Sequence, residues 1–178
     1  NFCAVELSSF YFDMRKDTLY CDPVDSLDRR AARTVLDQLY MSLTAWLAPI
    51  IPFTAEEAWL TRFPEEAVDG RIHLRQFSEI PAEWRDEVLA EKWQLVRNLR
   101  RVVTGALEIE RAEKRIGSSL GANATVYASP AYQTALIEVN LADLCITSSA
   151  SFDDGEAPAQ AFSISEVADI RVVITPAD

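Results

Sequence analysis

Residues 92–117 read KWQLVRNLRRVVTGALEIERAEKRIG, and this stretch decides the fold class. At 100° per residue its apolar side chains gather on one side of an α-helix. They are Leu95, Leu99, Val102, Val103, Ala106 and Ile109. The opposite side carries Arg97, Arg101, Thr104, Glu108, Arg111 and Arg115. We expect a long helix with a core side and a largely basic side, running from Pro81 to Ile116 and ended by a left-handed Gly117.

Two more helices are expected toward the N-terminus, over residues 5–20 and after the turn at Asp22–Ser26. The second has apolar residues at three- and four-residue steps, namely Ala32, Val35, Leu36, Leu39, Leu43, Trp46 and Leu47. Asp25 or Ser26 is placed to cap it. Pro49 and Pro52 should break it, because proline lacks the backbone N–H that the helix needs.

The next helix is predicted to begin at a capping box formed by Thr54 and Glu57. It should end at Phe63–Pro64, and residues 64–80 should form an irregular connection.

The pattern changes after Gly121. Strands are expected at 125–127, 144–147, 161–165 and 170–175, with a short helix at 131–139. We therefore predict a mainly α fold, in which residues 1–120 form a helical bundle and residues 121–178 form a small α+β domain.

The net charge of −11 argues against nucleic-acid binding, but its distribution is uneven. Residues 121–178 hold eight acidic residues and one basic residue, a charge of −7. Residues 92–115 hold seven basic and three acidic residues, a charge of +4. A local phosphate-binding face is therefore compatible with an acidic protein.

The sequence offers little catalytic chemistry. It has no glycine-rich phosphate loop and no paired metal ligands, and its only histidine, His73, is expected to be a surface or packing residue and not a catalytic base. The cysteines Cys3, Cys21 and Cys145 are far apart and are expected to be reduced thiols of a cytoplasmic protein. No apolar run approaches the roughly 20 residues of a membrane span, and no signal peptide is expected.

Three segments resemble bacterial isoleucyl-tRNA synthetase. Residues 7–20 are similar to that family's Leu-Ser-x-Phe-Tyr-x-Asp stretch, and residues 106–120 to its segment ending Lys-x-Ile-Gly-x-Ser-Leu. Residues 47–59 are shared in outline with the synthetases for valine, leucine and methionine. One departure is Gly121, where the family usually has glutamate, so no role is carried over for that carboxylate.

The resemblance implies an anticodon-binding helical bundle that recognises the anticodon stem-loop of tRNA(Ile). It implies a parent ligase, a monomer, in which the catalytic domain of the same polypeptide uses ATP and Mg to activate isoleucine. The His-Ile-Gly-His and Lys-Met-Ser-Lys-Ser signatures and the editing domain are absent from this sequence, so a fragment without catalytic activity and without cofactors is expected. A zinc module, common in the family, would lie beyond residue 178.

Candidate tRNA contacts follow from the need for cations at phosphates and aromatic rings at unpaired bases. The first set is Lys92, Trp93, Arg97, Arg100, Arg101, Arg111, Lys114 and Arg115. The second set is Arg29, Arg30 and Arg33.

Each set has a plainer interpretation. Trp93 could pack against a neighbouring helix, and the basic side could be an ordinary solvated surface. Asp25, Asp28 and Asp37 are close enough in sequence to neutralise the second set. The same domain of valyl-tRNA synthetase, or a protein-interaction module without an RNA role, are the alternatives for the whole chain.

Overall fold

The computed structural model describes residues 1–68 and 71–177. Contacts divide the chain into two compact units, Asn1–Arg85 and Asp86–Asp178. The long basic helix thus packs with the C-terminal sheet, although the sequence places a domain boundary between residues 120 and 121. The division into domains 1–120 and 121–178 stays a prediction, while the mainly α fold with a small α+β part is confirmed.

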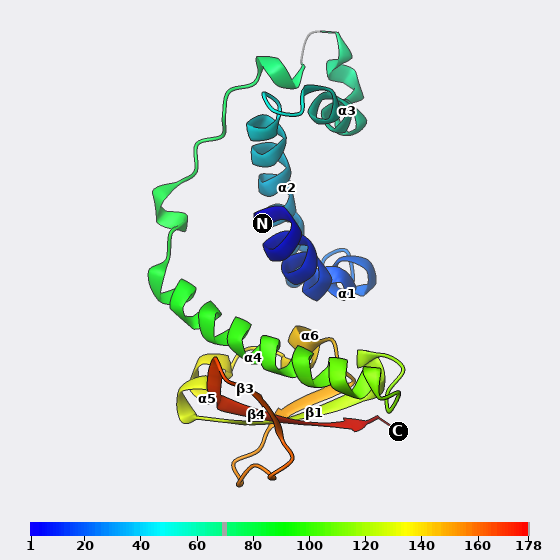
Figure 1. Cartoon of the computed structure of the whole chain (residues 1–178). Helices are drawn as coiled ribbons and strands as arrows, with labels where there is room; N and C mark the ends of the chain where they lie inside the picture. Colours follow the sequence, from blue (N-terminus) through cyan, green and yellow to red (C-terminus); the bar gives the residue numbers. More distant parts are fainter. Residues whose placement is uncertain (69–70, 178) are drawn as a thin grey trace. The chain divides into compact units, whose positions relative to one another are not determined.

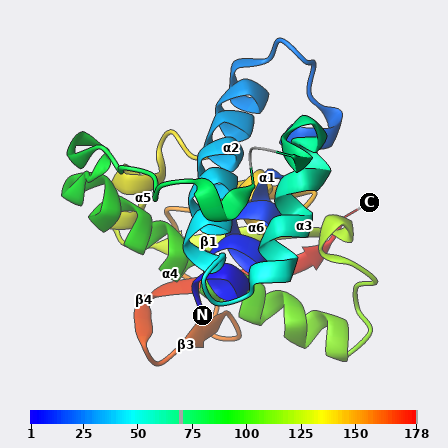
Figure 2. The ribbon, with the colours of Figure 1, turned by 90° about the horizontal axis from the view of Figure 1, so that it is seen from above.

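The first unit is built of helices. Its elements are η1 (Phe2–Phe12, π-helical), α1 (Asp13–Cys21), α2 (Leu27–Leu47), α3 (Pro52–Arg62) and the 3-10 turns η2 (Pro64–Ala67), η3 (Ile72–Leu74) and η4 (Ala82–Trp84). Both α1 and α3 contact α2, which makes α2 the central helix of this unit (Figure 2).

The ends of α2 and α3 test the expected signals. Ser26 caps α2, because its hydroxyl accepts a hydrogen bond from the Arg29 N–H at 3.4 Å. The break after α2 is confirmed, but the capping box at Thr54 is wrong. Pro52 already occupies the first turn of α3, which places Thr54 inside the helix.

Trp59 is the centre of the first unit's core. Its side chain is 1% exposed, and it packs with Ala45, Ala48, Ala55 and Ile72. The Trp59 indole stacks on the Tyr40 ring at 6.2 Å and donates a hydrogen bond from Nε1 to Glu66 at 2.8 Å. This core joins α2, α3 and η3, and so fixes where the outward-facing side chains of α2 and α3 lie.

The second unit is an α-helix on a sheet. Its elements are α4 (Glu87–Ala112), η5 (Ser119–Gly121), β1 (Ala122–Ala128), α5 (Pro130–Leu136), α6 (Leu141–Cys145), β2 (Ser149–Phe152), β3 (Phe162–Ile164) and β4 (Val167–Pro176). The strand order is β2-β1-β4-β3, with β1 parallel to β2 and antiparallel to β4. Figure 1 shows α4 lying across one face of this sheet, where it contacts β4, β3 and β1.

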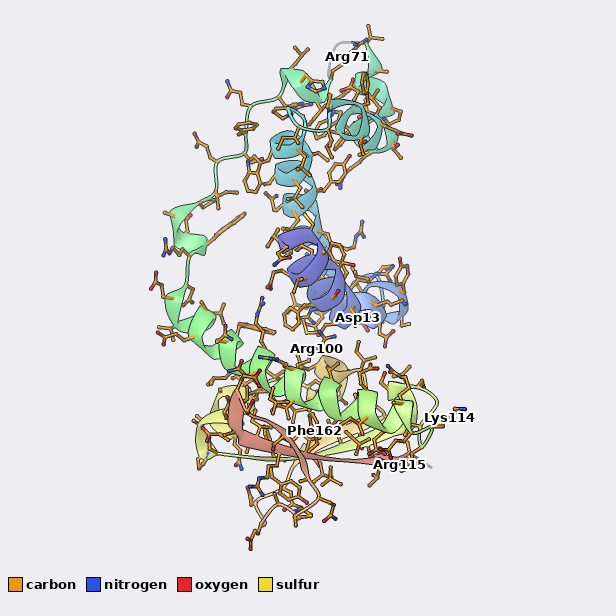
Figure 3. All side chains as sticks on the ribbon, in the orientation of Figure 1. Asp13, Arg71, Arg100, Lys114, Arg115 and Phe162 are labelled. Atoms are coloured by element: carbon orange, nitrogen blue, oxygen red, sulfur yellow. The ribbon has the colours of Figure 1, made fainter. Side chains whose placement is uncertain are left out.

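The buried stripe of α4 differs in part from the expected one. Leu99, Val102, Val103 and Ala106 are buried as expected, and Val96 and Leu107 join them. Ile109 is 41% exposed and belongs to the surface instead. The stripe faces the sheet, and Gly105 allows close approach there, because an added Cβ would lie 3.0 Å from the Phe162 ring (Figure 3).

The expected start and end of α4 are both wrong. The helix begins after Asp86, whose carboxylate accepts a hydrogen bond from the Leu89 N–H at 2.9 Å, while Pro81 precedes the separate turn η4. At the other end Lys114, not Gly117, has a left-handed backbone, with φ of 59°. The N–H groups of Lys114 and Arg115 bond to the carbonyls of Arg111 and Glu110, which is a Schellman motif.

The strand expected at residues 144–147 is also wrong. Leu144 and Cys145 end α6, which Asn140 caps by accepting hydrogen bonds from the N–H groups of Ala142 and Asp143. Ile146 then turns left-handed, with φ of 56°, and the chain enters β2 only at Ser149. The other expected strands correspond to β1, β3 and β4.

Candidate nucleic-acid interface

Most of the basic side of α4 is exposed to solvent, but several of its cations are paired with carboxylates. Arg101 Nη2 lies 3.3 Å from Glu166 Oε1, and Lys92 Nζ lies 3.7 Å from Glu138 Oε2. Arg111 pairs with Glu108 one turn away. These exposed pairs are each worth about 0–1 kcal/mol, so a phosphate could replace the carboxylate, although it would have to compete for the cation.

The end of α4 carries the densest of these charges. Arg115 pairs with both Glu110 and Glu113. The hydrogen bond from Arg115 lowers the pKa of the Glu110 carboxyl, and the same bond raises the pKa of Arg115. Lys114 is exposed beside this cluster. Two carboxylates thus share one guanidinium here, so a phosphate would have to compete with both of them for Arg115.

Arg100 differs from the other candidates of α4. Its Nε donates a hydrogen bond to the Leu144 carbonyl at 2.9 Å, and its side chain is only partly exposed. The bond ties α4 to the end of α6 beside Cys145, whose thiol pKa burial raises to about 12. Arg100 is therefore positioned to hold the second unit together.

Trp93 and Arg97 are half-buried, so they lie at the margin of the basic side. The structure gives Trp93 neither a fully exposed ring nor a fully buried one. Its stacking on a base and its packing against the protein both stay predictions, and so does phosphate contact by Arg97.

Arg29 of the second set is committed to the turn before α2. Its Nη1 donates to the Asp22 carbonyl, and its Nε is buried without a hydrogen-bond partner. Ser26 Oγ also donates to Asp22 Oδ2 at 3.3 Å, so the three residues brace the start of α2. Arg29 accordingly points back to the protein instead of to a ligand.

Arg30 and Arg33 have a different environment. Both are exposed, and no ion pair within residues 1–68 and 71–177 joins either of them to a carboxylate. The expectation that Asp37 neutralises them is wrong, because Asp37 pairs with Arg62 of α3. No ion pair to Asp25 or Asp28 is found in the same described residues.

Arg62 is the residue that sequence reasoning missed. It lies 25 positions from Asp37 and reaches it only because α3 folds back along α2. Its guanidinium lies over the Tyr40 ring at 4.9 Å and near the Phe63 ring at 5.3 Å, so aromatic faces hold it in place. No local sequence motif predicts that Arg62 pairs with Asp37.

Two hollows of the first unit meet at Thr34. A polar one of about 750 Å³ is lined by Arg30, Arg33, Thr34, Leu36, Asp37 and Arg62. An apolar groove of about 600 Å³ is lined mainly by α2 and the 79–84 segment, with Trp46 and Trp84 among its side chains. No lysine or arginine lines that groove among the described residues. Of the two hollows, the polar one is therefore the candidate for binding a phosphate.

The described residues include no candidate metal site, and their cysteines form no disulfide. Within the part of the chain that the structure describes, no group of three His, Cys, Asp or Glu side chains is placed so that it could hold a metal ion. His73 is exposed on η3, which makes it a surface residue and not a packing one, and the cysteines are free, with Cys3 and Cys21 exposed and Cys145 buried. No described helix is long and apolar enough to cross a membrane.

Comparison with known proteins decides the family. The family model described as the anticodon-binding domain of tRNA ligase matches residues 1–126. The chain belongs to this family. The match includes the whole first unit and α4, and extends into β1.

Relatives of this anticodon-binding domain protein extend the match to the C-terminal sheet. The isoleucine–tRNA ligase of Brucella abortus is 53% identical over 174 residues, which cover 97% of the chain. The isoleucine–tRNA ligases of Bartonella henselae and Mesorhizobium japonicum are 49% and 50% identical, over 97% and 100% of the chain. The chain spans 18% of the length of each of these ligases. The resemblance to the isoleucine enzymes is thus confirmed beyond the three motif segments.

Proposed function

We propose that the chain is the part of an isoleucine–tRNA ligase that recognises the anticodon end of tRNA(Ile). The observation that carries the proposal is an identity of about 50% to ligases of this name along the whole chain, together with the family match over residues 1–126. The parent enzyme would join isoleucine to tRNA(Ile) with ATP.

The proposed division of labour places the chemistry elsewhere in the parent polypeptide. ATP and Mg would act in its catalytic domain, and this chain would only bind and orient the tRNA. The described residues do not supply a cluster that fits a zinc ion, so any zinc module of the parent is assigned outside them. We further propose a cytoplasmic, monomeric enzyme. Isoleucine-dependent pyrophosphate exchange by the 178-residue chain alone would contradict this division.

Recognition by such a domain needs phosphate contacts for affinity and base contacts for specificity. The exposed cations of α4 and α2 provide the first kind of contact. Direct titration of labelled tRNA(Ile) with the chain tests the proposal. Binding should weaken strongly when the anticodon arm is deleted from the tRNA. Equal affinity for the deleted and the intact tRNA would contradict it.

The α4 side chains are the first set to test in that titration. The variant Arg97→Ala with Arg101→Ala should weaken tRNA binding and flatten its dependence on salt, because each phosphate contact contributes about 0.9 to the slope of log K against log salt. The fold should survive, since neither side chain is fully buried. If the variant had the same salt dependence as the unsubstituted 178-residue chain, this side of α4 would not be part of the tRNA interface.

A further inference from the structure

We propose that Arg30 and Arg33 of α2 and Arg62 of α3 form a binding site for the sugar-phosphate backbone of the tRNA. The inference rests on the proposed function and assigns a place on the first unit to the phosphate contacts. Neither Arg29 nor the carboxylate-rich end of α4 belongs to this site.

The backbone of α2 places two of the three cations together. Arg30 and Arg33 are three residues apart, so their side chains leave the same side of the helix about one turn apart. Both are exposed, and both line the polar hollow of about 750 Å³. A phosphate entering the hollow would therefore meet two guanidinium groups from one rigid helix.

The third cation comes from α3 and changes the charge of the hollow. Asp37 is the only carboxylate among the lining residues, and it is paired with Arg62. The lining thus carries three arginines and one aspartate, a formal charge of +2. Arg62 neutralises the one group that would otherwise attract Arg33 or repel a phosphate.

The paired cations of α4 are less available to a phosphate than Arg30 and Arg33 are. On α4, Arg101, Arg111 and Arg115 are each paired with glutamates of the same unit. A phosphate must compete with those carboxylates, whereas Arg30 and Arg33 have no such competitor among the described residues. Guanidinium groups also match phosphate oxygens with two parallel hydrogen bonds.

The test is a titration of labelled tRNA(Ile) with the 178-residue chain at several salt concentrations. Arg30→Ala with Arg33→Ala should weaken binding roughly tenfold. It should also make the fall of log K with log salt shallower, by about two units of slope. A matched control removes two exposed cations elsewhere, through Arg71→Ala with Arg171→Ala. The control variant should keep nearly the same salt dependence of tRNA binding as the unsubstituted 178-residue chain.

A second variant gives a change of the opposite sign. Asp37→Asn removes the carboxylate from the hollow and releases Arg62. Binding should therefore tighten a few-fold, and log K should fall more steeply with log salt. A partly unfolded protein would not bind more tightly, which separates this result from a folding defect. Circular dichroism of all variants checks that the helices are retained.

The outcomes separate the two proposals. If the unsubstituted 178-residue chain does not bind tRNA(Ile) at low salt, the proposed function fails, and this site fails with it. If the unsubstituted chain binds but the variant without Arg30 and Arg33 has the same salt dependence, only the site is wrong. Equal losses in the Arg71 and Arg171 control would also overturn the site, because they would show a response to total charge alone.

Discussion

Replacing Trp59 by alanine should lower the free energy of unfolding of the first unit by about 3–5 kcal/mol. Its side chain is 1% exposed and packs on the Tyr40 and Phe63 rings. The replacement leaves a cavity that neighbouring side chains fill only in part, and it removes the hydrogen bond from Nε1 to Glu66. Urea unfolding followed by circular dichroism measures the loss.

The matched control is Trp84→Ala, the same replacement at a side chain that is 57% exposed. It should cost less than about 1 kcal/mol, since surface substitutions rarely change stability more. If both variants lost the same stability, Trp59 would not be the centre of the core.

The Trp59 variant also connects stability with the proposed phosphate site. Trp59 anchors α3 against α2, and α3 carries Arg62 to its place opposite Asp37. A protein that lacks this anchor should therefore lose part of its tRNA affinity even at temperatures where most of its helix content remains.

The second large effect is expected at Arg100. Arg100→Ala should destabilise the second unit by roughly 1.5–3 kcal/mol, because a charged donor would be lost from the Leu144 carbonyl. The carbonyl belongs to a residue that is 1% exposed, so water would replace the guanidinium poorly. Thermal unfolding measures the change, and the salt slope of tRNA binding should stay unchanged.

Arg101→Ala is the neighbouring control. Arg101 is exposed and pairs with the equally exposed Glu166, so its loss should cost at most about 1 kcal/mol. A salt slope that falls for Arg100→Ala, without loss of stability, would return Arg100 to the tRNA interface and refute its structural role.

Much of the fold could be predicted from the sequence, because periodicity and strong breakers are local signals. The apolar steps of α2 and the break at Pro49 and Pro52 depend on side chains within one or two turns. The basic and apolar sides of α4 follow from the same rule. Such patterns need no knowledge of distant residues.

The errors lie where two local signals compete or where a side chain chooses its partner in space. Pro81 and Asp86 could each begin α4, and the side-chain hydrogen bond made by Asp86 decides. Leu144 and Cys145 resemble a strand, but the Asn140 cap starts a helix there. Gly117 is the better residue for a left-handed position, yet α4 ends at Ala112 and Lys114 adopts the left-handed conformation instead.

The candidate site shows the same limit more strongly. The sequence marks the arginines of α2 and α4 but not their ion pairs. Asp37 could pair with Arg33 by spacing along α2, and it pairs with Arg62 because of how α3 folds back. Whether an arginine is available to a ligand depends on such ion pairs between residues far apart in the sequence. The candidate tRNA-binding arginines can therefore be ranked from the structure but not from the sequence.

Competition between anticodon stem-loops tests the central claim most directly. Labelled tRNA(Ile) bound to the 178-residue chain would be displaced by unlabelled stem-loops from the isoleucine and valine tRNAs, at one fixed salt concentration. An anticodon-recognition domain of an isoleucine–tRNA ligase should release the label at clearly lower concentrations of the isoleucine stem-loop. Equal displacement by both, or by neither, would contradict the proposed function, and preference for the valine stem-loop would assign the domain to the valine enzyme.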